Sequence, residues 1–345
     1  MQLPKDVYLY LADFGDDRTI IEMLSVNKTF NDPRFFYRIF NKRYPQLIQF
    51  KKPNEDWKQF YLRMTHYIFK LKEEINFDYL PAPSLNPENF YREMKYFKER
   101  RPAELIQHLA VRTIFFAAEI GDLDTIFRND DFIQDKSIVL EYIVNGAARS
   151  GNLKIYQMFE KRFGEIFEDE ISRVTMKEAA LSGNMEMMEY IQNKLLSKGY
   201  SINGIVEAAI EGAAELGDLN LIQHFESLSS GDEDVYHAVI GGAIAGGHLE
   251  ILKHYLSKVE EDEDEDFYDG YIESASEYGQ LEILRYLIEE KYRGTTKNLL
   301  SLLKGSIITD PNVLAYVQSL KKNIKKSKKK DKKGKRGKKK DKKEK

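Results

Sequence analysis

The chain has 345 residues, of which 42% are hydrophobic and 12% aromatic, and its formal net charge is −3. This length predicts two or more folded units, and the lack of cysteine excludes disulfides, thiolate zinc sites and thiol nucleophiles. No apolar run is long enough to span a membrane, and the N-terminus lacks a signal-peptide pattern, so we expect an intracellular protein.

Residues 1–45 are expected to form a small domain of short helices. Leu3 and Pro4 open it, since proline suits the first turn of a helix, and it closes on the phrase VNKTF at 26–30. The pattern resembles an F-box, which begins with Leu-Pro and closes on Val-x-x-x-aromatic. The resemblance implies contacts to a Skp1-type protein of a cullin ubiquitin ligase through Leu3, Pro4, Val7, Leu11, Leu24, Val26 and Phe30. The alternative is a packed helical cap.

Residues 46–108 are expected to be a helical, aromatic-rich linker region. It holds the only tryptophan, Trp57, and its aromatic side chains are expected to lie in a core. Prolines at 81, 83 and 87 predict a break in helical structure and an extended connection.

Residues 109–320 contain six copies of one short phrase, such as AARSGNLKIY and ASEYGQLEIL. An alanine stands four residues before each repeated glycine, and the glycines, 30 to 34 residues apart, are Gly121, Gly151, Gly183, Gly217, Gly247 and Gly279. Such a period is typical of stacked helical units. The glycine is expected to end the first helix in the left-handed conformation. Small residues before it let first helices approach closely, and Asp or Asn after it caps the second helix.

The phrase AIAGGHLEILKHYL at 243–256 resembles the second half of an ankyrin repeat. The resemblance covers roughly 112–320, but the Thr-Pro-Leu-His opening is missing from every copy, so any hairpins between units are expected to be short or irregular. Thr309 takes the place of the glycine in a degenerate seventh copy, which is expected to cap the array. Tetratricopeptide repeats are the alternative, but their tryptophan and proline landmarks are absent.

The expected fold class is therefore all-α. It comprises an ankyrin-like helical solenoid preceded by a small helical F-box-like domain and followed by a disordered basic tail. This combination resembles proteins of large DNA viruses of amoebae, which implies host–virus interaction and a location in the host cytoplasm.

No grouping in the sequence predicts catalysis or a cofactor. HExxH, G-x-S-x-G and P-loop patterns are absent. His248 follows a repeat glycine, and His224 and His254 occupy equivalent positions in neighbouring units, which indicates structural roles instead of a metal site. We therefore predict a protein that is not an enzyme and holds neither metal nor cofactor.

Two blocks of like charge lie in the C-terminal half. The seven consecutive acids at 260–266 predict an exposed loop that could contact a basic partner or the chain's own tail. The tail, 321–345, has sixteen lysines, one arginine and three acids, so its charge is +14 and the other 320 residues carry −17.

Such a tail cannot bury enough apolar area to fold, so disorder is expected. It is a candidate for importin recognition and nuclear entry, for nonspecific polyanion binding, or for a solubilising role. The cations that would carry the first two are Lys328, Lys329, Lys330, Lys332, Lys333, Lys335, Arg336, Lys338, Lys339 and Lys340.

Together these features predict an adaptor that recruits a client protein, held on the repeats, to a Skp1/cullin ligase. The alternative is a plain ankyrin-repeat scaffold without a ubiquitin link. A nucleic-acid role through the tail is less favoured, because the body is acidic. No membrane partner is expected.

Overall fold

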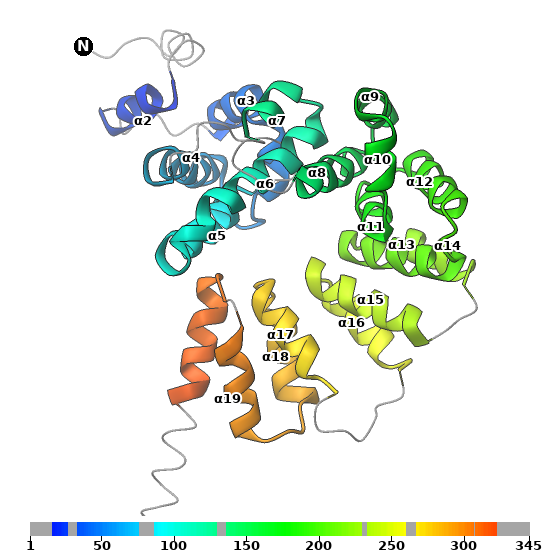
Figure 1. Ribbon diagram of the computed structural model, residues 1–345. Helices are drawn as coiled ribbons and strands as arrows, with labels where there is room; N and C mark the ends of the chain where they lie inside the picture. Colours follow the sequence, from blue (N-terminus) through cyan, green and yellow to red (C-terminus); the bar gives the residue numbers. More distant parts are fainter. Residues whose placement is uncertain are drawn as a thin grey trace, which may run out of the picture. The chain divides into compact units, whose positions relative to one another are not determined.

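The computed structural model describes residues 16–26, 33–75, 86–129, 136–229, 233–259, 267–306 and 308–322. Within these ranges all regular secondary structure is helical (Figure 1), which confirms the all-α prediction for the part of the chain that is described. The helices fall into two compact units that divide between Asp135 and Lys136.

The first unit contains helices before and after residue 45, where the F-box-like domain was predicted to end. Its elements are α2 (Asp17–Val26), α3 (Pro33–Arg43), the 3₁₀ helix η1 (Pro45–Phe50), α4 (Trp57–Glu74), α5 (Pro87–Arg100), α6 (Pro102–Ile120) and α7 (Leu123–Asn129). A capping box fixes the start of α4: the Asp56 side chain accepts the backbone N–H of Gln59, and the Gln59 side chain accepts that of Asp56.

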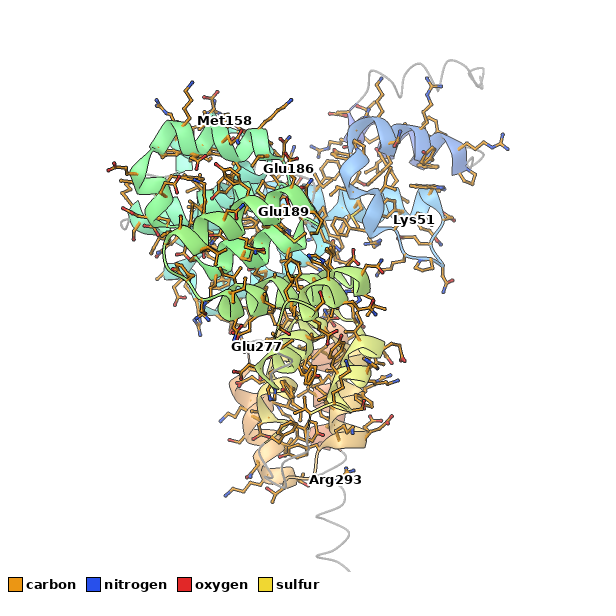
Figure 2. All side chains as sticks on the ribbon, turned by 90° about the vertical axis from the view of Figure 1, so that its right-hand side faces the viewer. Lys51, Met158, Glu186, Glu189, Glu277 and Arg293 are labelled. Carbon is orange, nitrogen blue, oxygen red and sulfur yellow. The ribbon has the colours of Figure 1, made fainter. Side chains whose placement is uncertain are left out.

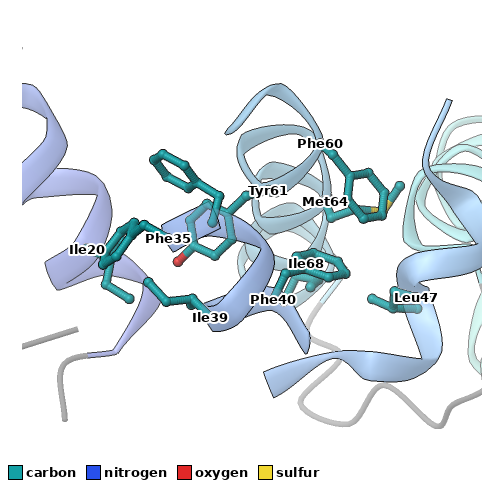
Figure 3. Packing of buried hydrophobic residues seen from close by; sticks show 10 residues of the cluster. Ile20, Phe35, Ile39, Phe40, Leu47, Phe60, Tyr61, Met64 and Ile68 are labelled. Carbon is teal, nitrogen blue, oxygen red and sulfur yellow. The ribbon is translucent and has the colours of Figure 1, made fainter. Parts of the chain in front are cut away.

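One hydrophobic core joins α2, α3, η1 and α4 (Figure 3). It is aromatic, as expected: the rings of Phe40 and Phe60 lie 4.5 Å apart between centroids, and Tyr61 is fully buried. A second cluster joins α4, α5 and α6 around Phe90 and Phe116. Residues predicted to belong to the F-box-like segment and to the linker region therefore share a core.

Pro87 stands at a helix boundary. It occupies the first position of α5, where Asn86 caps the helix by accepting the N–H of Glu88 at 3.0 Å. Proline fits there because the first N–H groups of a helix have no partner within the helix. The other two prolines, at 81 and 83, lie outside the described residues, so the extended connection stays a prediction.

The second unit is built from helix pairs in chain order. Its first helices are α8 (Lys136–Arg149), α11 (Arg173–Leu181), α13 (Ile202–Leu216), α15 (Glu233–Gly246), α17 (Asp269–Glu277) and α19 (Thr296–Gly305). Their partners are α9 (Leu153–Phe163), α12 (Met185–Ser197), α14 (Leu219–Glu226), α16 (Leu249–Leu256), α18 (Leu281–Tyr286) with the π-helix η3 (Leu287–Lys291), and helix 311–322. A short extra helix, α10 (Glu165–Asp169), follows α9. Each first helix contacts the next one along the chain.

The predicted turns are present at all six repeat glycines, whose φ angles lie between +61° and +82°. At Gly217 the backbone N–H bonds to the carbonyls of Ala213 and Ala214, which closes α13. Asn152, Asn184 and Asp218 cap the second helices that follow them, as expected.

His248 and Gln280 stand at the same position but do not cap. Each reaches back to the preceding unit: His248 Nε2 lies 3.1 Å from the Glu215 carbonyl oxygen, and Gln280 Nε2 donates to that of Ala245 at 2.8 Å. Each of these side chains therefore links its own helix pair to the helix pair before it in the chain.

Small residues allow neighbouring first helices to approach at backbone distance, as predicted. A Cβ added at Gly212 of α13 would lie 2.4 Å from the Lys177 carbonyl oxygen of α11. One added at Gly242 of α15 would lie 2.2 Å from the Glu211 carbonyl oxygen of α13. Only glycine fits at these two contacts.

The decayed seventh copy is also a helix pair. Asp310 accepts the backbone N–H groups of Asn312 and Val313 at 2.8 and 3.0 Å, which caps helix 311–322. Val313 and Val317 of that helix are buried.

Candidate functional site

Most of the residues predicted to bind partners lie outside the described part of the chain. These are Leu3, Pro4, Val7, Leu11, Phe30, the acids at 260–266 and the tail cations from Lys328 to Lys340. Leu24 and Val26 belong to α2, but their side chains are not among those described. Candidate surfaces among the described residues lie in both compact units.

In the first unit, a groove of about 720 Å³ lies between α2 and α4. The apolar side chains of Ile21, Leu62 and Phe69 line it, together with Asp16 and His66. Asp16 directly follows the segment 1–15, so the groove adjoins the part of the chain to which the Skp1-type contact is assigned.

In the second unit, charged residues gather along one side of the first helices. In α13, Glu207, Glu211 and Glu215 stand ten, six and two residues before the repeat glycine. A spacing of four places them on one side of a helix. In α11, Arg173 and Lys177 stand ten and six residues before Gly183, the repeat glycine of that helix.

Because the helices pack in register, equivalent positions meet across them. Lys177 Nζ lies 2.7 Å from Glu211 Oε1 and 3.0 Å from Glu215 Oε2, and Arg173 lies 3.9 Å from Glu207. Burial disfavours the charge on Lys177, but Glu215 and Glu211 outweigh it, so the pKa of the ammonium is raised.

A similar pair joins α8 and α11, again with the cation on the earlier helix. Arg149 of α8 donates to Glu178 of α11 at 2.8 Å. Burial is the larger influence on this carboxyl, so the pKa of Glu178 is raised even though Arg149 favours its charged form.

The carboxylates of α13 also reach the end of α17. The Tyr278 side chain is 57% exposed, yet partial desolvation at its hydroxyl raises the pKa of the phenol. Lys177 counteracts this rise, while the nearby charges of Glu215, Glu211 and Glu277 add to it. The charges of α11 and α13 therefore act on the phenol of Tyr278.

Between α13 and α17, α15 has small, half-buried residues at two of the three equivalent positions, and the third, His237, contacts the Tyr271 hydroxyl of α17. Gly241 and Ala245 stand six and two residues before the repeat glycine, where α13 has glutamates, and a Cβ at Gly241 would meet no atom within 4 Å. Ala238 lines a cavity of about 230 Å³ that it shares with Glu207 and Lys177. The strip is open and flanked by acids.

We call this surface the first-helix face. Its members are Arg173, Lys177, Glu207, Glu211, Glu215, Ala238, Gly241, Ala245, Glu273, Glu277 and Tyr278. Five glutamates stand against one arginine and one lysine, which leaves three negative charges in excess. Sequence reasoning did not single out these residues, although counting back from each repeat glycine would have aligned them.

A separate polar cluster lies among α9, α10 and α12. Lys194 Nζ contacts both Glu160 and Glu168, and Tyr190 OH donates to Glu160 at 2.7 Å. Burial and a hydrogen bond that the protonated carboxyl donates to Glu160 raise the pKa of Glu168. The pKa of Glu160 is lowered: burial opposes its charge, but hydrogen bonds with Glu168, Lys194 and Tyr190 favour it.

In the described ranges, no group of three or more His, Cys, Asp or Glu side chains is arranged to hold a metal ion. None of the helices described there combines the length and apolar character needed to cross a membrane. The first-helix face offers carboxylates and small residues, a surface suited to binding cationic side chains.

No family model, curated protein or solved structure matches the chain.

Proposed function

We propose that the protein is a non-enzymatic interaction adaptor. Its helix pairs form an ankyrin-like solenoid, and a client protein binds the first-helix face. The observation that carries the proposal is the shared register of the first helices, because it brings Lys177, Glu211 and Glu215 onto one continuous surface. Arrays of this kind bind partners along extended surfaces.

Residues 1–45 are proposed to act as an F-box-like segment that delivers the client to a Skp1-type protein of a cullin ubiquitin ligase. The groove between α2 and α4 supports this role, since its apolar lining of Ile21, Leu62 and Phe69 lies next to Asp16. The chain has no cysteine and so cannot carry ubiquitin as a thioester. It would act by bringing proteins together.

The test is co-purification with an amoebal Skp1-type protein. The variant Leu3→Ala/Pro4→Ala/Val7→Asp should no longer co-purify, so its recovery with the Skp1-type protein should be lost. A matched variant, Leu219→Ala/Leu228→Ala, removes exposed apolar side chains from the second unit and should keep it. Equal recovery of all three proteins would contradict the ligase link.

The second candidate is a plain scaffold in which the N-terminal helices are structural. The shared core favours it: Phe36 and Phe40 of α3 are fully buried in a cluster that includes Phe60 and Met64 of α4. Client capture with an unchanged partner set after the N-terminal substitutions would support this candidate.

The tail is proposed to direct the protein from the cytoplasm to the nucleus through importin, or to hold polyanions loosely by counterion release. Lys328–Lys330 and Lys338–Lys340 are its densest cationic runs. Replacing both runs by glutamine should abolish nuclear accumulation of a fluorescent fusion if importin reads them. Unchanged accumulation would exclude that role.

A further inference from the structure

We propose that residues 323–345 dock on the first-helix face and compete there with the client. The inference rests on the proposed function only in assigning the client to that face. The occupant is a defined segment of this chain, and three observations select it.

The first observation is charge complementarity. Residues 323–345 contain fourteen lysines, one arginine and three acids, a net charge of +12. The first-helix face has five glutamates against two cations, and Lys177 and Arg173 already form pairs with three of those glutamates. Glu273 and Glu277 of α17 add carboxylates on the other side of the open strip.

The second observation is the room on α15. Lysine places its charge at the end of a flexible four-carbon stem that can lie along apolar surface. The strip of Ala238, Gly241 and Ala245 presents no long side chain, and the space beside Gly241 is free of contacts. Lysine stems can therefore cross α15 while their ammonium groups reach the glutamates of α13 and α17.

The third observation is reach. Asp310 lies 3.0 Å from the position of a Cβ at Gly279, so the turn before helix 311–322 is next to Tyr278. That helix, from 311 to 322, covers about 18 Å. The 23 residues that follow can extend to about 75 Å. The whole first-helix face is within reach.

Weak contacts are sufficient for docking because the tail belongs to the same chain as the first-helix face. Exposed ion pairs contribute little one by one, but covalent attachment of the tail to the same chain gives it an effective concentration of about a millimolar. Docking should therefore be partial and strongly dependent on salt. A cationic client segment would displace the tail, and added salt would release it.

The experiment is zero-length carbodiimide cross-linking of the full chain at about 50 mM salt, read by peptide mapping of the monomer. The first-helix variant is Glu207→Gln/Glu273→Gln/Glu277→Gln. The control variant is Glu186→Gln/Glu189→Gln/Glu282→Gln, which removes three exposed acids from second helices; Figure 2 labels Glu186, Glu189 and Glu277.

Tail lysines should cross-link to glutamates of the first-helix face. The yield should fall about tenfold in the first-helix variant, and at about 500 mM salt, but not in the control variant. Cross-links that map mainly to second helices or to 260–266, that join separate chains only, or that are equal in both variants would overturn the proposal.

Client capture by the same two variants separates the two ideas. If tail cross-links are absent but the first-helix variant loses its client, docking of the tail is wrong and the adaptor role stands. If the cross-links appear as expected but client capture is unchanged, the tail docks and the client binds elsewhere.

Discussion

Lys177, Lys194 and Lys198 show how single side chains connect elements of the second unit. Lys198 donates to three backbone carbonyls, those of Glu168 at 2.8 Å, Asp169 at 3.0 Å and Ile171 at 2.9 Å. One ammonium has three donors, so this lysine satisfies the end of α10 from a helix about thirty residues away. The sequence shows no sign of the contact, since the partners are distant along the chain.

At the same scale, the raised pKa of Glu168 predicts a pH effect on stability. A carboxyl whose pKa is raised in the folded state binds its proton more tightly there than in the unfolded chain. The stabilisation is complete below the ordinary pKa of 4.5 and is lost as the pH rises through the raised value.

The variant Glu168→Gln should lack this contribution. Its urea midpoint relative to wild type should therefore increase between pH 4 and pH 7. Ser197→Ala, a change on the neighbouring exposed surface, serves as the control and should show a constant difference. A parallel pH profile for wild type and Glu168→Gln would contradict the assignment.

A second residue-scale prediction concerns Arg63 in the first unit. Its guanidinium bonds to Glu55 at 2.7 Å, to Glu88 at 2.9 Å and to the Phe50 carbonyl at 3.0 Å. Arg63→Met would leave two largely buried carboxylates without this partner, so unfolding should cost about 2 kcal/mol less. Denaturant unfolding of the full chain measures the change.

The control for Arg63 is Lys95→Met. Lys95 and Glu99 form an exposed pair at 3.7 Å, and such pairs contribute well under about 1 kcal/mol. If the two variants unfold alike, the buried network around Arg63 does not hold the unit together.

At the scale of elements, the helix ends could be predicted from sequence because their signals are local. A glycine with positive φ and a following Asn or Asp specify a turn within a few residues, and Gly217 with Asp218 shows both. The start of α5 at Pro87, which Asn86 caps, has an equally local signal. By contrast, α10 is contacted by Lys194 and Lys198, about thirty residues away in the chain, so local signals did not predict it.

The glycines within first helices support a matched prediction. Gly242→Ala would place a methyl group 2.2 Å from the Glu211 carbonyl oxygen, which forces α13 and α15 apart and should destabilise by about 1 to 3 kcal/mol. Gly241→Ala adds the same methyl one residue earlier into open space and should stabilise by up to about 1 kcal/mol. Thermal and denaturant unfolding of both variants give the comparison.

The decisive result is whether Gly242→Ala and Gly241→Ala change the free energy of unfolding in opposite directions. Two equally stabilised variants would show that the first helices are not in backbone contact at Gly242. Gly212→Ala, with a clash of 2.4 Å against the Lys177 carbonyl oxygen, should repeat the outcome at the neighbouring pair of helices.

At the scale of the whole molecule, the repeated phrase and the compact units do not coincide. The first copy, around Gly121, lies in α6 and α7 of the first unit, and the other five lie in the second. A repeat pattern records which helix pairs are alike, whereas a compact unit depends on which surfaces meet, so the sequence could predict only the former. The partner residues 3–30 and the tail remain predictions.

An array of neighbours predicts graded stability along the second unit. In such arrays each pair is supported mainly by the adjacent ones, so end units open first. Hydrogen exchange of the full chain should be slowest in α11, α13 and α15 and faster in helix 311–322. Uniform protection across 136–322 would indicate a single cooperative block.

The turn contacts have a consequence for how such a chain can change over time. The site that a side chain at Gly217 would occupy is filled by the ring of His248, and the site at Gly247 by Gln280. A single substitution at either turn therefore meets the neighbouring side chain and also a backbone conformation that other residues rarely adopt. Duplication of a whole stretch of about thirty residues would copy a turn glycine together with the side chain that packs against it. Such an array can therefore be lengthened by duplication more readily than its turns can be changed one residue at a time.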